Sequence, residues 1–344
     1  GLLQHWRANA TGSGCATMRT PACGFSRPAR STRRQAGANV APGVTQRQKR
    51  STVCRQALPI VHHGEPTMTQ LNPTEEFFRD LAETVKGPAG ALEGKKALVI
   101  GIANNQSIAY GCALAFRALG ASVAMTYVNE KSKPYTQALA DHLGVDPALY
   151  LPCDVRIPGQ LEAVFEAIGE TWGQLDIGLH SIAFAPRDDL HGRVTDCSRD
   201  GFLMAMDVSC HSFIRMAKLA EPLMKDGGSL FTMSYYGAEK VVDRYNLMGP
   251  VKAALEASAR YLAAELGPKG IRVHPISPGP IRTRAASGID RFDELMEIAA
   301  TRAPRRMLVS IEDVGMATAF LASDYAKLIT GQTMHIDGGY HVIG

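Results

Sequence analysis

KALVIGIANNQSIAYGCALAFRALGA, residues 96–121, contains the pattern that decides the fold. It starts with a continuous apolar run that ends at Gly101, which is typical of a strand buried on both faces. After a short polar loop, apolar residues recur at helical spacing from Ile108 to Gly120, a residue type that commonly ends helices. We therefore predict a strand, a tight turn and a helix, the first part of an alternating α/β fold.

The same alternation continues to the C-terminus. Further strand-like segments read SVAMTYV, ALYLPCDV, LDIGLHSIAF, GSLFTMSYY, GIRVHPISPGPI and TGQTMHIDGG. Helical segments such as GQLEAVFEAIGETWG and VKAALEASARYLAAELG lie between them. Strands that alternate with helices of this length predict one Rossmann-like, doubly wound parallel sheet with helices on both faces, over residues 94–344. Ligands of such a sheet bind at the carboxyl ends of its strands.

Residues 1–67 differ in composition from the rest of the chain. Residues 1–64 contain ten Lys or Arg and no Asp or Glu. A basic segment without lasting apolar periodicity is predicted to be disordered. It could be translated upstream sequence before Met68, an organelle transit peptide, or a nucleic-acid-binding arm, but a basic tail without interleaved aromatics is weak support for the last. Residues 68–93, with NPTEEFFRDLAETVK, are predicted to form a helical arm.

The overall composition excludes several classes of protein. The chain is 45% hydrophobic and 20% charged, and it contains no apolar run long enough to span a membrane. Its seven cysteines form no CxxC pair, which favours free thiols in a reducing compartment. We expect a cytoplasmic protein, or an organellar one if the basic segment is a transit peptide, with neither a nucleic acid nor a membrane as partner.

The first strand-to-helix turn is the expected phosphate site. GIANNQSIAYG, residues 101–111, is not a GxGxxG motif, because Asn105 and Ser107 stand where glycines would be. Ser107 is instead expected to cap the helix that begins at Ile108, directing backbone N–H groups and a hydroxyl at a pyrophosphate. A capped helix without a ligand is the alternative interpretation.

Residues after the second and third strands bear on the cofactor. Val128 is the expected tip of the second strand, with Glu130 and Lys131 just beyond it. No Arg stands there to favour a 2′-phosphate, so NADH is preferred over NADPH. Asp154, after the third strand, could accept a hydrogen bond from an adenine amino group or could only cap a turn. The small residues of HSIAFAP, after the fourth strand, would let a nicotinamide approach the backbone.

Tyr245 and Lys252 form the most informative pair. Residues seven apart on one helix differ by only about 20° around its axis, so both would share a face if one helix runs through them. A nearby ammonium favours the ionised form of a phenol. The lysine could also bind the ribose hydroxyls of a cofactor. The alternative is an exposed Lys and a half-buried Tyr on an amphipathic helix.

From about Gly94 onward the chain resembles the short-chain dehydrogenase/reductase superfamily and, within it, the bacterial NADH-dependent enoyl-[acyl-carrier-protein] reductases. The motifs HSIAFAP, SYYGAE, YNLMGPVKAALE, PGPIRTRAASGI and ITGQTMHIDGG carry this resemblance in order. Most of the superfamily place Tyr and Lys four residues apart, whereas the enoyl reductases use seven. Their phosphate loop has the form G-x5-S-I-A, which is present here from Gly101 to Ala109.

The resemblance implies reduction of a trans-2-enoyl thioester, held by an acyl carrier protein, to the saturated thioester with NADH in fatty acid elongation. It implies a homotetramer, Tyr245 as the catalytic tyrosine, Tyr235 as a second tyrosine beside the substrate, and Lys252 at the cofactor ribose. Together with Val128, the expected cofactor contacts are Gly101, Ser107, Ile108, Asp154, Val155, Ile182, Ile281, Arg282, Thr283, Arg284 and Ala285. The expected acyl pocket is formed by Ala185 and Met248, with Ala286, Ile289 and Phe292 in a mobile flap.

The chain also departs from the pattern of these enzymes. Arg284 stands where relatives usually have leucine. Past the flap, where relatives present basic residues to the acidic carrier protein, this chain has Asp290, Asp293 and Glu294. Carrier docking could instead use basic residues nearby, namely Arg282, Arg284, Arg302, Arg305 or Arg306.

Two other functions stay open at the level of sequence. A reductase of 3-oxoacyl thioesters or other carbonyls from the same superfamily would need a lysine four residues beyond the tyrosine, where this chain has Gly249. A catalytically silent nucleotide-binding module would have no need of both Tyr245 and Lys252.

Overall fold

The structure is a computed structural model that describes residues 90–284, 286 and 292–343. All of these residues belong to one compact unit. The predictions for residues 1–67 and for most of the arm, residues 68–89, lie outside the described residues. Gly90–Gly94 form a turn that packs on the end of the first described helix, where the N–H of Leu92 donates to the carbonyl of Leu119 at 2.9 Å.

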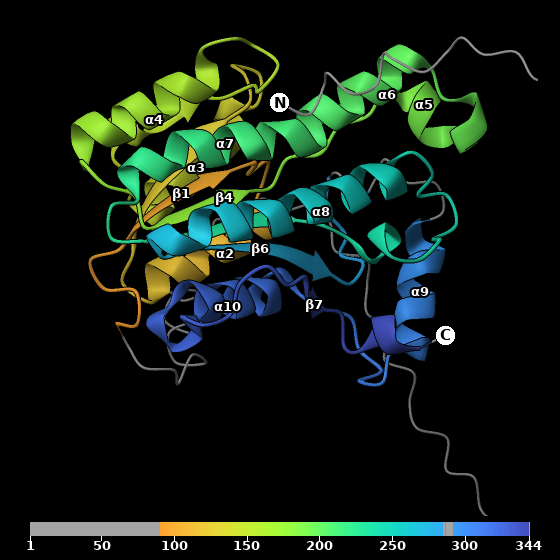
Figure 1. The fold of residues 1–344 in the computed structure, drawn as a ribbon. Coiled ribbons are helices and arrows are strands. Elements are labelled where there is room, and N and C mark those ends of the chain that lie inside the picture. Colours follow the sequence, from red (N-terminus) through yellow and green to blue (C-terminus); the bar gives the residue numbers. More distant parts are fainter. Residues whose placement is uncertain (1–89, 285, 287–291, 344) are drawn as a thin grey trace, which may run out of the picture. The chain divides into compact units, whose positions relative to one another are not determined.

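In the described part of the chain, seven strands form a single parallel sheet (Figure 1). The strand order is β3-β2-β1-β4-β5-β6-β7, which confirms the predicted doubly wound fold. The chain reverses its direction of winding between β1 and β4, so the carboxyl ends of these two strands are where a ligand of such a sheet binds. The strands are β1 Lys96–Ile100, β2 Ser122–Tyr127, β3 Tyr150–Pro152, β4 Ile177–His180, β5 Gly228–Met233, β6 Ile271–Pro278 and β7 Met334–Ile336.

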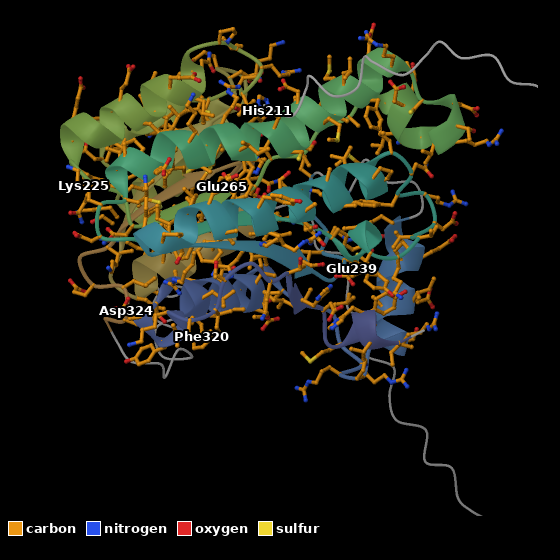
Figure 2. The ribbon with its side chains drawn as sticks, viewed as in Figure 1. His211, Lys225, Glu239, Glu265, Phe320 and Asp324 are labelled. Carbon is orange, nitrogen blue, oxygen red and sulfur yellow. The ribbon has the colours of Figure 1, made fainter. Side chains whose placement is uncertain are left out.

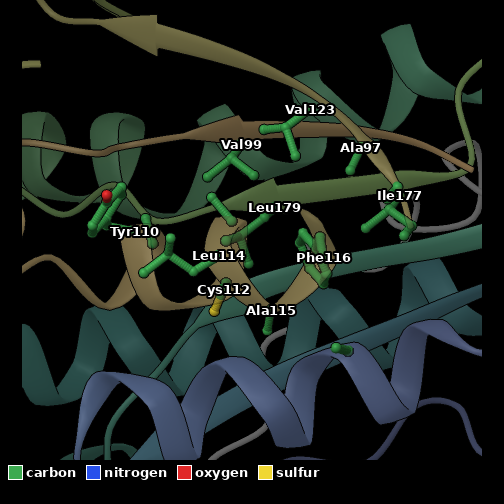
Figure 3. Packing of buried hydrophobic residues seen from close by; sticks show 14 of the residues in the cluster. Ala97, Val99, Tyr110, Cys112, Leu114, Ala115, Phe116, Val123, Ile177 and Leu179 are labelled. Carbon is green, nitrogen blue, oxygen red and sulfur yellow. The ribbon is translucent and has the colours of Figure 1, made fainter. Parts of the chain in front are cut away.

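Helices cover both faces of the sheet because successive strand residues point to opposite sides. Val99 of β1 packs into a core with α2, α3 and α10, whereas its neighbours Leu98 and Ile100 pack with α4, α7 and α8. Figure 3 shows the first of these cores, with Val99, Val123 and Leu179 above the side chains of α2. The covering helices are α2 Ile108–Ala118, α3 Lys133–Leu143, α4 Gln160–Thr171, α7 Ser212–Ala220, α8 Met248–Leu266 and α10 Ile311–Ala322.

Helices α2 and α10 approach each other closely through two glycines. A Cβ on Gly111 would lie 2.2 Å from the carbonyl oxygen of Ile311, and a Cβ on Gly315 would lie 2.2 Å from the carbonyl oxygen of Gly111. Both contacts are with backbone, so the two helices could not stay this close with any larger residue at either position. This pair fixes α2, and with it the turn that precedes α2.

The remaining described helices are α5 Arg187–His191, α6 Arg199–Met206 and α9 Phe292–Arg302, with a π-helical turn at Asp207–His211 between α6 and α7. In this turn His211 is exposed (Figure 2), and its Nδ1 lies 3.0 Å from the carboxylate of Asp207. The His211 side chain therefore makes a contact at the protein surface. Ser209, also in the turn, donates to and accepts from the backbone of Phe184, which ties down the loop after β4. None of the helices in the described ranges has the length and apolar character needed to cross a membrane.

Candidate active site

A cavity of about 680 Å³ lies at the carboxyl ends of β1 to β4, where the sheet reverses its winding. We call it the sheet-end cavity. Its volume and position fit a dinucleotide. The predicted cofactor residues that line it are Gly101, Val128, Asp154, Val155, Ile182 and Arg284. The structure thus brings together residues from four different strand ends that are far apart in sequence.

Gly101 ends β1 in a conformation that requires glycine. Its φ is +110°, and a Cβ there would lie 2.1 Å from the carbonyl oxygen of Ser181. The backbone just after β1 and the backbone just after β4 therefore approach each other with no side chain between them. The base of the cavity stays open as a result.

Ser107 occupies the N-cap position of α2, as predicted, but its hydroxyl does not cap the helix. The Oγ instead accepts hydrogen bonds from the N–H groups of Ala103, at 3.0 Å, and Asn104, at 3.1 Å. The expectation of a side-chain cap was therefore wrong, because the Ser107 hydroxyl binds the backbone of the loop before α2 and not the N–H groups of the helix. The first turn of α2 is left to present its backbone N–H groups outward.

Asp154 caps the turn after β3 and holds an arginine. Its carboxylate accepts from the N–H of Arg156 at 3.0 Å and from the Arg156 Nη2 at 2.6 Å, and these bonds hold the pKa of Asp154 below its usual range. The Arg156 guanidinium lies 5.4 Å from the ring centre of Phe184. Both residues line the sheet-end cavity. Arg156, from the segment after β3, therefore reaches this cavity. The sequence was searched for an arginine only at the end of β2, so Arg156 was missed.

A second cavity, of about 340 Å³, adjoins the first, because Ala183 and Phe184 line both. We call it the tyrosine cavity, since Tyr235 and Tyr245 both belong to its wall. Its lining is largely apolar. The predicted acyl-pocket and flap residues that it brings together are Ala185, Met248, Ala286 and Phe292, whereas Ile289 lies outside the described residues.

The segment after β6 divides between the two cavities. Ile281 and Thr283 line the tyrosine cavity, as does Ile108, while Arg284 lines the sheet-end cavity. Arg282 points away and pairs with Asp293 at 2.7 Å. The alternation follows from an extended chain, in which successive side chains point to opposite sides. Ala285 lies outside the described residues.

Tyr245 stands on a turn and not on the helix that carries Lys252. Helix α8 begins at Met248, and Arg244 and Asn246 on either side of Tyr245 have φ values of +65° and +40°. Left-handed residues cannot continue into an α-helix, so the expectation that one helix runs through both residues was wrong. The Asn246 amide donates to the carbonyl of Leu190 at 3.0 Å and holds the turn in place.

The two tyrosines pack edge to face, with ring centres 4.8 Å apart. Burial, with smaller contributions from Tyr235 and Glu256, raises the pKa of Tyr245 above its ordinary value, and burial raises the pKa of Tyr235 to about 12. The expectation that Lys252 favours the phenolate was therefore wrong, because burial dominates the shift and Lys252 is not among the groups that move the pKa of Tyr245. Both phenols are protonated hydrogen-bond donors at neutral pH.

Lys252 is buried below this turn and supports the end of β5. Its Nζ donates to the carbonyl oxygen of Met233 at 2.5 Å, and it lines neither of the two cavities. Burial lowers the pKa of Lys252 to about 8, so the ammonium is still mostly charged at neutral pH. His180, by contrast, is a satisfied core histidine whose ring nitrogens lie near the hydroxyls of Thr232 and Ser212.

The comparisons with known proteins agree on one family. Residues 101–341 match the family described as Enoyl-(Acyl carrier protein) reductase. Enoyl-[acyl-carrier-protein] reductase [NADH] 1 of Rhizobium meliloti is 46% identical over 256 residues, which cover 74% of this chain and 93% of that protein.

Solved structures give the same result. An enoyl-(acyl-carrier-protein) reductase from Anaplasma phagocytophilum in complex with NAD is 47% identical, with a TM-score of 0.71 over 75% of this chain and 97% of its own. The Bacillus cereus enoyl-acyl carrier protein reductase with NADP+ and an indole naphthyridinone is 44% identical, with a TM-score of 0.72 over 74% and 99%. With a family match over most of its length and relatives at this level of identity, the chain belongs to the enoyl-(acyl carrier protein) reductase family.

Proposed function

We propose that this protein reduces trans-2-enoyl thioesters of acyl carrier protein to saturated acyl thioesters, with NADH as the hydride donor, in fatty acid elongation. The observation that carries the proposal is the pair of adjoining cavities. One has the size and position for a dinucleotide, and the other is apolar and contains two protonated tyrosines. An apolar cavity beside the nicotinamide end of a nucleotide site suits an acyl chain.

Tyr245 is the proposed donor to the thioester oxygen. NADH bound in the sheet-end cavity would supply a hydride for the β-carbon, and negative charge then develops on that oxygen as an enolate. A neutral phenol with a raised pKa donates a hydrogen bond where this charge appears and does not add a competing negative charge. Tyr235 packs against its ring and limits the positions that Tyr245 can take.

Preference for NADH is supported by the described end of β2, which has no arginine, although Lys131 there also lines the sheet-end cavity. Val128 lines the cavity there with its side chain half exposed, and it offers no partner to a phosphate. The Arg156 guanidinium that reaches the same cavity is already bound by Asp154. A 2′-phosphate would therefore have to compete with a carboxylate for this arginine.

The assay that tests the function follows NADH oxidation at 340 nm with two substrates. We expect rapid turnover of crotonyl thioester and little or none of acetoacetyl thioester. The opposite preference would favour the carbonyl-reductase alternative. NADH binding without turnover of either substrate would favour the catalytically silent module.

Lys252 is proposed to hold the cofactor ribose as well as the end of β5. Replacing it with Ala is expected to weaken NADH binding by about 10- to 100-fold, because a charged hydrogen bond is worth about 1.5–3 kcal/mol. Fluorescence titration of NADH measures the change. Lys240→Ala, an exposed lysine on the same side of β5, is the matched control and should bind NADH as the wild type does. Unchanged affinity in Lys252→Ala would contradict the ribose contact.

The quaternary structure and the compartment belong to the same proposal. We propose a homotetramer in the cytoplasm, which is supported by the family resemblance. Arg282 forms an ion pair with Asp293, so a carrier protein is proposed to meet Arg305 and Arg306 instead. Light scattering on the purified protein would give the mass of the assembly directly.

A further inference from the structure

Ser234 links the tyrosine cavity to a buried carboxyl group. It follows β5 directly and belongs to the wall of the tyrosine cavity. Its hydroxyl donates to Oε1 of Glu256 at 2.5 Å. Glu256 lies one helical turn after Lys252 on α8 and is only 5% exposed, which is unusual for an acidic residue that is not ion-paired to a close base.

Glu256 also lines a third cavity, which shares no lining residue with the tyrosine cavity. This outer cavity has a volume of about 540 Å³ and is lined by residues of α8 and of two loops, namely Ala238, Glu239, Ala253, Glu256, Arg260, Gly331, Gln332 and Thr333. Glu239, which is labelled in Figure 2, and Arg260 are exposed, so the outer cavity reaches the surface of the described chain. The hydrogen bond between Ser234 and Glu256 therefore stands between a surface cavity and the tyrosine cavity.

We propose that Glu256 and Ser234 form a proton relay that carries protons from the outer cavity into the tyrosine cavity. The proposal rests on the reductase chemistry above, in which each turnover forms two C–H bonds, one from a hydride and one from a proton. The protonated carboxyl of Glu256 donates its proton to the Ser234 oxygen, and the Ser234 hydroxyl releases its own proton inward to the enolate carbon. A solvent proton from the outer cavity then restores Glu256, so no oxidant or reductant besides NADH is needed.

The surroundings of Glu256 make its carboxyl a weaker acid than an ordinary glutamate. Burial is the largest influence and raises its pKa, and the carboxylate of Glu239 acts in the same direction. Hydrogen bonds from Ser234 and Thr333 and the charge of Arg260 oppose this rise without cancelling it. An acid whose pKa moves toward neutrality both gives and regains a proton readily, which is the property that a relay needs.

Two of the charged residues near Glu256, Lys252 and Glu239, already have other partners. Lys252 donates to the Met233 carbonyl and not to the carboxyl. Glu239 lies 3.5 Å from the His335 Nε2. Glu256 is thus held by two hydroxyl-bearing residues, Ser234 and Thr333, and these are groups that can pass a proton in either direction.

Glu256→Gln is the decisive variant, because glutamine keeps an oxygen for the Ser234 hydroxyl but cannot transfer a proton. We expect kcat with crotonyl thioester to fall by about 10- to 100-fold, a larger solvent deuterium isotope effect on kcat, and an unchanged dissociation constant for NADH. Ser234→Ala should give a similar loss, and the double variant should be no worse than either alone. Glu265→Gln, an exposed acid further along α8 that lines none of the three cavities, is the matched control and should keep wild-type kcat.

Chemical rescue separates a relay from a purely structural role. In Glu256→Ala the missing carboxyl leaves space that joins the outer cavity, and added formate is expected to raise kcat in a concentration-dependent manner while leaving Glu265→Gln unaffected. Wild-type kcat in Glu256→Gln, or a loss of kcat with neither formate rescue nor a changed isotope effect, would overturn the relay alone. A wild-type protein that does not reduce crotonyl thioester would overturn the proposed function and the relay together.

Discussion

Replacing Tyr245 with Phe is expected to lower kcat for crotonyl thioester by about 10²–10³-fold and to leave NADH affinity unchanged. The phenol is the proposed partner of the charge that develops on the thioester oxygen, so its removal acts on the transition state and not on the ground state. The ring itself stays, and so does its edge-to-face contact with Tyr235, with ring centres 4.8 Å apart. Because KM should change far less than kcat, steady-state kinetics distinguishes this outcome from a loss of substrate binding.

The matched control is Tyr236→Phe. Tyr236 directly follows Tyr235 but packs against Tyr340 and lines neither of the two adjoining cavities. It should keep wild-type kcat. Tyr235→Phe should lie between the two, since Tyr235 shares the cavity wall but is assigned no charge to stabilise. Wild-type kcat in Tyr245→Phe would remove Tyr245 from its proposed role whatever the other two variants show.

Replacing Gly315 with Ala is expected to lower the free energy of unfolding by about 3 kcal/mol, near the upper end for an overpacked core. The new methyl group would meet the Gly111 carbonyl oxygen at 2.2 Å, and a backbone atom cannot turn aside as a side chain can. Helices α2 and α10 must therefore separate and expose apolar surface that both now bury. Urea unfolding followed by circular dichroism measures the change.

Gly169→Ala is the control for this variant. Gly169 lies in α4, and a Cβ there would be 3.6 Å from the Leu223 side chain, an ordinary van der Waals distance. Alanine favours a helix interior over glycine by about 1 kcal/mol, so this variant should be as stable as the wild type or more stable. Equal midpoints for Gly315→Ala and Gly169→Ala would contradict the close approach of α2 and α10.

The sequence predicted the sheet because each strand is a continuous apolar run bounded by a loop. A strand that is buried on both faces needs apolar residues at successive positions, so this pattern is typical of a parallel sheet. Many residues that line the two cavities were named from the family resemblance. Ile108, Ile281 and Thr283, expected at the cofactor, line the tyrosine cavity instead, and Ser107 and Lys252 line neither cavity. The prediction failed at Tyr245, because the start of α8 depends on left-handed conformations at Arg244 and Asn246. Neither residue type signals such a conformation strongly in this context.

The pKa of Tyr245 and the burial of Glu256 could not be predicted from the sequence either. A lysine seven residues from a tyrosine suggests a lowered phenol pKa, but the depth of burial reverses the sign, and burial comes from the tertiary fold. Glu256 was missed for a similar reason. An acid four residues after Lys252 is typical of a surface ion pair on an amphipathic helix. Only the packing of α8 against the end of β5 shows that the carboxyl is buried beside Ser234.

The turn that carries Tyr245 has a consequence for the design of inhibitors. Because Tyr245 lies on a turn that the Asn246 amide ties to Leu190, whereas the Lys252 ammonium is bound to the Met233 carbonyl at the end of β5, the two can be perturbed separately. A small apolar molecule wedged against the turn would displace the phenol while the dinucleotide kept its affinity. Such a compound is expected to compete with the acyl thioester and not with NADH.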